Sequence, residues 1–105
     1  MDLEELTQLC DRLTESVSLG PGLQNALFAM PEVRATIATL RREITAFDIR
    51  DELATIEASF EKWFTLDTWR GHDQGQSFQH DLYADIFRLK TSIRLWHASR
   101  SASHP

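Results

Sequence analysis

Paired histidines and acidic residues in the second half of the chain are the first candidates for chemistry. His72 precedes Asp73, His80 precedes Asp81, and Asp85 follows Asp81 by one helical turn. Such side chains can bind a metal ion or transfer protons. A zinc site needs three or four converging ligands, and neither a His-Glu-x-x-His nor a cysteine-rich spacing supplies them. We therefore expect no metal, cofactor, catalytic residue or small-molecule substrate, and keep a small metal-binding protein or enzyme using these residues as an alternative.

Charged residues are distributed unevenly along the chain. The net charge of −5 argues against general nucleic-acid affinity, because that affinity depends on Lys and Arg neutralising phosphates. Residues 1–18 carry five acidic residues and one arginine. Residues 86–105 carry no acidic residue and four basic ones, which are Arg88, Lys90, Arg94 and Arg100. The complementary charges predict that the two terminal helices lie side by side, and a nucleic-acid-binding regulator using the basic C-terminal helix is a second alternative.

Aromatic residues are concentrated around the polar segment 65–76. Most should lie in the core, because aromatic side chains dominate burial in small domains. The two helices flanking the segment nevertheless carry more apolar positions than one narrow contact requires. Trp, Tyr and Arg are favoured anchors at protein interfaces. We therefore predict a partner-binding surface formed by Trp63, Phe64, Trp69, Arg70, Tyr83, Phe87 and Trp96.

The elements that carry these residues are predicted from apolar periodicity. Apolar residues recur at steps of three and four, which is typical of amphipathic helices. A first helix over 2–18 is capped by Asp2, and a second over 23–29 buries apolar side chains that include Leu23 and Leu27. A bend follows at Met30–Pro31, because proline disfavours helical geometry in the residue before it. A last helix covers 77–98, after a loop over 65–76 and before a frayed tail over 99–105.

The central segment 31–64 contains two apolar stripes. The stripe from Val33 to Phe47 and the stripe from Ile49 to Phe64 lie about 170° apart on one helical wheel. A break at Phe47–Asp48 would let the chain fold back as a four-helix bundle. No glycine or proline stands there to force a break. We therefore favour one long or kinked helix of about 50 Å that is packed on two sides.

Composition sets the class of protein. A chain of 105 residues with 42% hydrophobic residues predicts one domain, residues 1–105, of the all-α class: a small bundle of three to four helices. Cys10 is the single cysteine and lies on an apolar stripe, which favours packing over catalysis and a reducing compartment. The acidic N-terminal segment does not resemble a signal peptide, and no apolar run is long enough to span a membrane. We expect a cytoplasmic, non-enzymatic interaction module, an adaptor, assembly factor or regulator that binds another protein and forms a homodimer.

Overall fold

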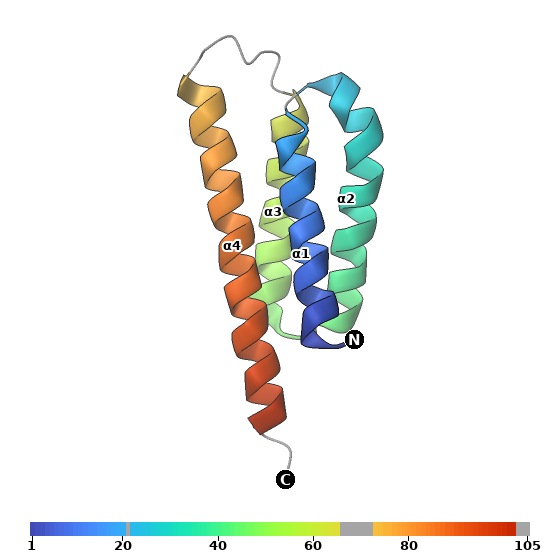
Figure 1. Ribbon diagram of the computed structural model, residues 1–105, viewed down its shortest axis with the longest axis vertical. Helices are drawn as coiled ribbons and strands as arrows, with labels where there is room; N and C mark the ends of the chain where they lie inside the picture. The colour runs from blue at the N-terminus through green and yellow to red at the C-terminus, as the bar shows by residue number, and fades with distance from the viewer. Residues whose placement is uncertain (21, 66–72, 103–105) are drawn as a thin grey trace.

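Four antiparallel helices form an elongated bundle in the computed structural model, which describes residues 1–20, 22–65 and 73–102, with the backbone alone for 73–76 and 101–102. The helices are α1 (Leu3–Ser18), α2 (Leu23–Glu43), α3 (Phe47–Thr65) and α4 (Asp73–Ala102). They run alternately up and down around a shared core, with α1 and α3 each packed between α2 and α4 (Figure 1). The predicted all-α helical bundle is confirmed.

Helix α1 begins and ends at local signals. The Oδ1 atom of Asp2 accepts a hydrogen bond from the backbone N–H of Glu5 at 2.8 Å, which satisfies a donor that the helix leaves without a partner. The turn after α1 contains Gly20 and Gly22 at φ values of 94° and 115°, where other residues are strained. The side-chain amide of Asn25 donates to the carbonyls of Leu19 and Gly20 at 2.9 and 3.1 Å. These contacts fix the chain reversal into α2.

Helix α2 continues through Pro31 without interruption. The predicted separate helix over 23–29 is therefore wrong, because 23–43 form a single helix that includes Met30 and Pro31. A proline in a helix interior removes one backbone donor and costs about 3 kcal/mol relative to alanine. Met30 and Val33 are both buried on the core side, while Pro31 itself is exposed. Burial of the helix face on both sides of the proline offsets this cost.

A short turn over 44–46 separates α2 from α3. Ile44 adopts extended geometry (φ −112°, ψ 119°), and its N–H donates to the carbonyl of Leu40 at 2.9 Å. The favoured continuous helix over 31–64 is therefore wrong, and the alternative in which the chain folds back is right. The break lies just before the predicted Phe47–Asp48 position. Phe47 begins α3 and is 81% exposed, so it does not belong to the buried stripe assigned to it.

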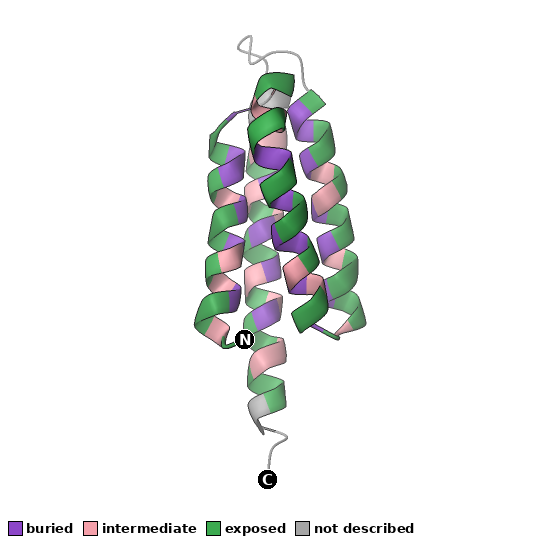
Figure 2. Cartoon of the chain, turned by 90° about the vertical axis from the view of Figure 1, so that its right-hand side faces the viewer, coloured by how far each residue is buried: buried purple, intermediate pink, exposed green. Residues whose placement is uncertain are grey.

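The chain reversal explains how both stripes are buried. From Val33 to Ile44 and from Ile49 to Phe64, the stripe residues are at most 1% exposed. On one straight helix the two stripes would face opposite directions, and each would need a separate partner. Because α3 runs back along α2, both stripes face the same core, which α1 and α4 complete (Figure 2). Neither stripe is sandwiched between separate layers.

Helix α4 is longer than predicted at both ends. It begins at Asp73 instead of Ser77 and continues to Ala102 instead of 98. The predicted loop 65–76 is thereby shortened, since Thr65 belongs to α3 and 73–76 belong to α4; residues 66–72 lie outside the described part. The predicted tail 99–105 is helical to Ala102, and 103–105 lie outside the described part.

The two terminal helices lie side by side, as their charges predict. The Nζ atom of Lys90 in α4 lies 2.7 Å from the Oδ1 atom of Asp11 in α1. Both side chains keep contact with water, so this ion pair contributes at most about 1 kcal/mol. Among the described residues, no helix has the length and hydropathy that a membrane crossing requires.

Candidate functional site

Trp63 and Phe64, which were predicted to contact a partner, lie in the core. Their exposed fractions are 0% and 1%. The ring of Trp63 stacks on Phe78 of α4 with centroids 6.0 Å apart, and Phe64 stacks on Phe60 with centroids 6.1 Å apart. Both side chains hold α3 in the bundle and are inaccessible to another protein. Their place in the partner-binding surface is therefore corrected.

The other predicted contact residues are divided between surface and interior. Phe87 is 68% exposed on α4. Tyr83 is half-buried, with its hydroxyl 2.9 Å from the Oγ atom of Ser18. Trp96 is half-buried, and the guanidinium of Arg100 lies over its ring at 4.7 Å. Trp69 and Arg70 lie outside the described residues.

A group of large apolar side chains is exposed at the end of the bundle where α1 passes into α2. We call this group the α1–α2 end; its members are Leu19, Leu23, Leu27 and Phe28, exposed by 56%, 70%, 78% and 80%. The expectation that Leu23 and Leu27 are buried was wrong. The core stripe of α2 passes through Ala29, Met30 and Val33, so both leucines point elsewhere. Phe28 lies outside that stripe in the sequence as well, and this position was the sequence signal that could have predicted its exposure.

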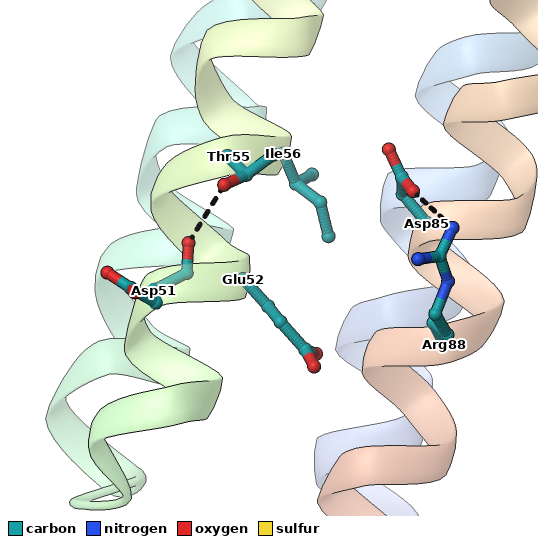
Figure 3. A pocket seen from close by; sticks show the side chains of 6 residues that line it. All are labelled: Asp51, Glu52, Thr55, Ile56, Asp85 and Arg88. Carbon is teal, nitrogen blue, oxygen red and sulfur yellow. Dashed lines mark hydrogen bonds and ion pairs between the residues drawn. The ribbon is translucent and has the colours of Figure 1, made fainter.

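A pocket of about 320 Å³ opens between α3 and α4 (Figure 3). Its walls carry Asp51, Glu52, Thr55, Ile56, Asp85 and Arg88. Glu52 extends from α3 toward α4, where Ser92 donates a hydrogen bond to its Oε1 atom at 3.1 Å. The Oε2 atom of Glu52 is buried and accepts no hydrogen bond from the described residues. Asp85 is paired with Arg88 at 2.9 Å, so its carboxylate is already neutralised by a neighbour on its own helix.

The acidic and histidine residues do not converge on one point within the described residues. No group of three or more His, Cys, Asp or Glu side chains there could hold a metal ion. His80 and Asp81 are exposed on α4. His72 lies outside the described residues, and for Asp73 only the backbone is described. The alternative of a metal-binding protein or enzyme therefore gains no support from the described geometry.

Two carboxylates one helical turn apart on α3 have structural partners. Glu57 lies 3.7 Å from Arg41 of α2, and Glu61 lies 3.6 Å from Arg34 of the same helix. These ion pairs connect neighbouring helices along the outside of the bundle. Their positions favour a structural role for these carboxylates, in which they help to keep α3 beside α2, over acid–base chemistry.

Three of the four basic residues on α4 have partners within the chain. Arg88 contacts Asp85, Lys90 contacts Asp11, and Arg100 covers Trp96. Arg94 is exposed. A phosphate backbone would have to compete with these contacts, and this geometry gives the nucleic-acid alternative little support.

Cys10 is part of the core. Its side chain is 0% exposed, and burial raises the pKa of its thiol from 9.0 to about 12. The nearby Lys90 and Arg94 act in the opposite direction, and Asp11 acts with burial. A thiol that stays protonated is a poor nucleophile and metal ligand, which agrees with the packing role predicted for it.

Packing inside the bundle does not explain why several large apolar side chains are exposed on its surface. Comparison of the chain with protein-family models, with curated proteins and with solved structures gives no match. Surface chemistry is therefore the available guide to its function.

Proposed function

We propose that this chain is a non-enzymatic protein–protein interaction module, an adaptor, assembly factor or regulator that binds another protein and also associates with itself. The observation that carries the proposal is the exposure of the α1–α2 end. Four large apolar side chains within ten residues of sequence are 56–80% exposed there. Single exposed apolar residues are ordinary, but a group of them marks a surface that another molecule covers.

The α1–α2 end has the anatomy of a binding surface. Leu23 and Leu27 lie one helical turn apart on α2, and Phe28 directly follows Leu27. The Asn25 amide fixes the backbone of Leu19 next to the first turn of α2. The apolar side chains therefore stand on a backbone that is already ordered, which lowers the entropy lost on binding. Burial of these side chains against a partner stabilises the complex by about 25 cal/mol for every Å² of apolar surface removed from water.

The proposed location is the cytoplasm. The single cysteine, Cys10, is a free buried thiol, and reduced thiols are usual in that compartment.

Capture from extracts of the native cells tests the proposal. The tagged wild-type chain is compared with the double variant Leu27→Ser, Phe28→Ser and with the matched control Phe47→Ser, which removes an equally exposed aromatic ring from the start of α3. We expect a protein that the wild type and the control recover and the double variant does not. All three chains should melt alike, because substitutions at exposed positions change stability by at most about 0.5 kcal/mol.

A photo-reactive residue placed at position 28 or at position 47 makes the test direct. We expect an adduct with another protein from position 28 and none from position 47. Equal recovery by the double variant, together with equal labelling at the two positions, would contradict the proposal.

A further inference from the structure

The side of α2 that faces away from the core carries a second row of regularly spaced residues. Its members, all exposed, are Gln24, Phe28, Pro31, Ala35, Ala38 and Arg42. Successive members are four, three, four, three and four residues apart, which is the heptad spacing of a helix that packs along another helix. At about 100° per residue, this row lies about 170° from the buried row that runs from Val33 to Ile44. We call the exposed row the outer seam of α2; it is about 27 Å long.

The outer seam is apolar along most of its length. From Ser16 to Pro31 the sequence contains no charged residue. Phe28 in the seam and Leu27 beside it are 80% and 78% exposed. The exposed residues of α1, by contrast, are all polar or charged: Glu4, Glu5, Gln8, Asp11, Arg12, Glu15 and Ser18. A helix side that contacts only water resembles α1 in this respect, so the composition of the outer seam indicates that another element covers it.

The sizes of the seam residues favour an α-helix as the covering element. Pro31, Ala35 and Ala38 have short side chains, so they form a shallow strip between Phe28 and Arg42. Helices pack with their axes about 8–10 Å apart, and bulky side chains of one helix fill the spaces between the side chains of the other. A strip about 27 Å long matches about 18 residues of a second helix.

Charges on the two edges of the seam define the chemistry of that helix further. Arg34, on the edge toward α3, is already paired with Glu61 at 3.6 Å. Glu32 is exposed on the opposite edge and has no ion-pair partner among the residues that the structure describes. A complementary helix therefore carries apolar residues where it covers the seam and a basic residue where it passes Glu32.

We infer that the partner protein contributes an amphipathic α-helix that lies along the outer seam of α2. This helix presents bulky apolar side chains to Pro31, Ala35 and Ala38, reaches Phe28 at the α1–α2 end, and directs a Lys or Arg toward Glu32. The inference rests on the proposed function, because it names the kind of element that the partner supplies and extends the α1–α2 end along α2.

Photo-reactive residues along the seam test where the partner lies. One such residue replaces Phe28, Ala35 or Ala38 in separate chains; the controls replace Ala54 or Ala58, which are exposed one turn apart on α3. We expect one protein in extracts of the native cells to be labelled from all three seam positions and from neither control. Mass spectrometry should locate the labelled sites in a single segment of that protein, at spacings of three, four or seven residues.

A synthetic peptide of the labelled segment then measures the contact. It should bind the purified chain and become helical on binding, as followed by circular dichroism. Ala35→Glu should weaken binding about tenfold or more, because a charge is buried without a partner, whereas the matched control Ala58→Glu should leave binding unchanged. Glu32→Lys should weaken binding as well, and reversal of the facing basic residue in the peptide should restore the affinity. Melting curves of the variants establish that each chain is folded.

The outcomes separate this inference from the proposed function. Labelling from position 28 without labelling from 35 and 38 would overturn the inference and leave the proposed function intact, since the partner would contact the α1–α2 end alone. Labelled sites scattered over several segments, a second copy of this chain as the labelled protein, or a peptide insensitive to Ala35→Glu would also overturn the inference. Absence of labelling from every seam position would contradict both proposals.

Discussion

Replacement of Trp63 by alanine tests the division of aromatic residues into core and surface. The sequence places Trp63 and Phe87 in the same predicted binding surface, whereas the structure buries Trp63 completely and leaves Phe87 68% exposed. Trp63 also stacks on Phe78 across the α3–α4 contact. Trp63→Ala should therefore destabilise the fold, and Phe87→Ala should not.

The size of the expected effect follows from burial and chain length. Removal of a buried tryptophan side chain costs about 3–5 kcal/mol, because transfer energy is lost and a cavity remains. A domain of this length unfolds with an entropy of about 0.22 kcal/mol/K near its midpoint, so the melting temperature of Trp63→Ala should fall by about 14–23 °C. Phe87→Ala, at an exposed position, should change stability by at most about 0.5 kcal/mol, which is about 2 °C.

Helical circular dichroism followed against temperature and guanidinium measures both variants. Since total stability is only about 5–15 kcal/mol, Trp63→Ala can leave the chain largely unfolded. Trp63→Phe then provides a milder test, with a loss of about 0.5–3 kcal/mol. The reasoning is refuted if Trp63→Ala melts within a few degrees of the wild type, or if Phe87→Ala is as damaging as Trp63→Ala.

Two further predictions concern the backbone of α2 and the buried thiol. Pro31→Ala should raise the free energy of unfolding by about 1–3 kcal/mol, because Pro31 is exposed and alanine restores a helical N–H at this position; guanidinium titration measures the change, and a decrease would contradict it. The pKa of Cys10 is about 12 in the folded chain and near 9.0 without burial, so above pH 9 the unfolded chain binds fewer protons than the folded chain. The free energy of unfolding should therefore fall by about 1.4 kcal/mol per pH unit between pH 9 and about 12. Cys10→Ala should lack this part of the slope, and identical slopes in the two chains would refute the assignment.

Periodicity predicted the core well where one face of a helix is apolar. The stripe Val33, Ile37, Leu40 and Ile44 is buried completely, and so is its counterpart in α3 from Ile49 to Phe64. In α4 the residues from Leu82 to Ile93 on the stripe are buried, whereas Phe78 and Trp96 at its ends are half-buried. The Asp2 cap and the proximity of α1 and α4 also followed from residue types and charge. These features depend on neighbours in sequence or on net charge, which a single chain displays directly.

The errors occurred where local preference is weak and tertiary burial is strong. Asp48 and its neighbours differ from good helix formers by only a few tenths of a kcal/mol, so propensity could not position the break. Burial of two opposed stripes in one core is worth many times more, and it places the turn at 44–46. For the same reason α2 continues through Pro31, since packing of the helix on both sides of the proline outweighs the cost of the proline in a helix.

The candidate surfaces depended on the tertiary structure more than the core did. A helical wheel identifies a broad apolar face on α4. It cannot show that the Tyr83 hydroxyl contacts Ser18 or that Phe87 remains exposed. It also could not show that Leu27 points away from the core or that α4 extends past the ends of the neighbouring helices. Exposure of a side chain depends on which helices pack beside it, and that information lies in contacts between distant segments.

The sequence by itself determined four amphipathic faces, their apolar stripes and the charge on each terminal helix. Only the tertiary structure decided where the chain reverses, which aromatic residues are buried, and which large apolar side chains remain exposed. The physical reason is that the period of a pattern fixes the direction of a side chain on its own helix. Whether that side chain is buried depends on which other helix packs against it.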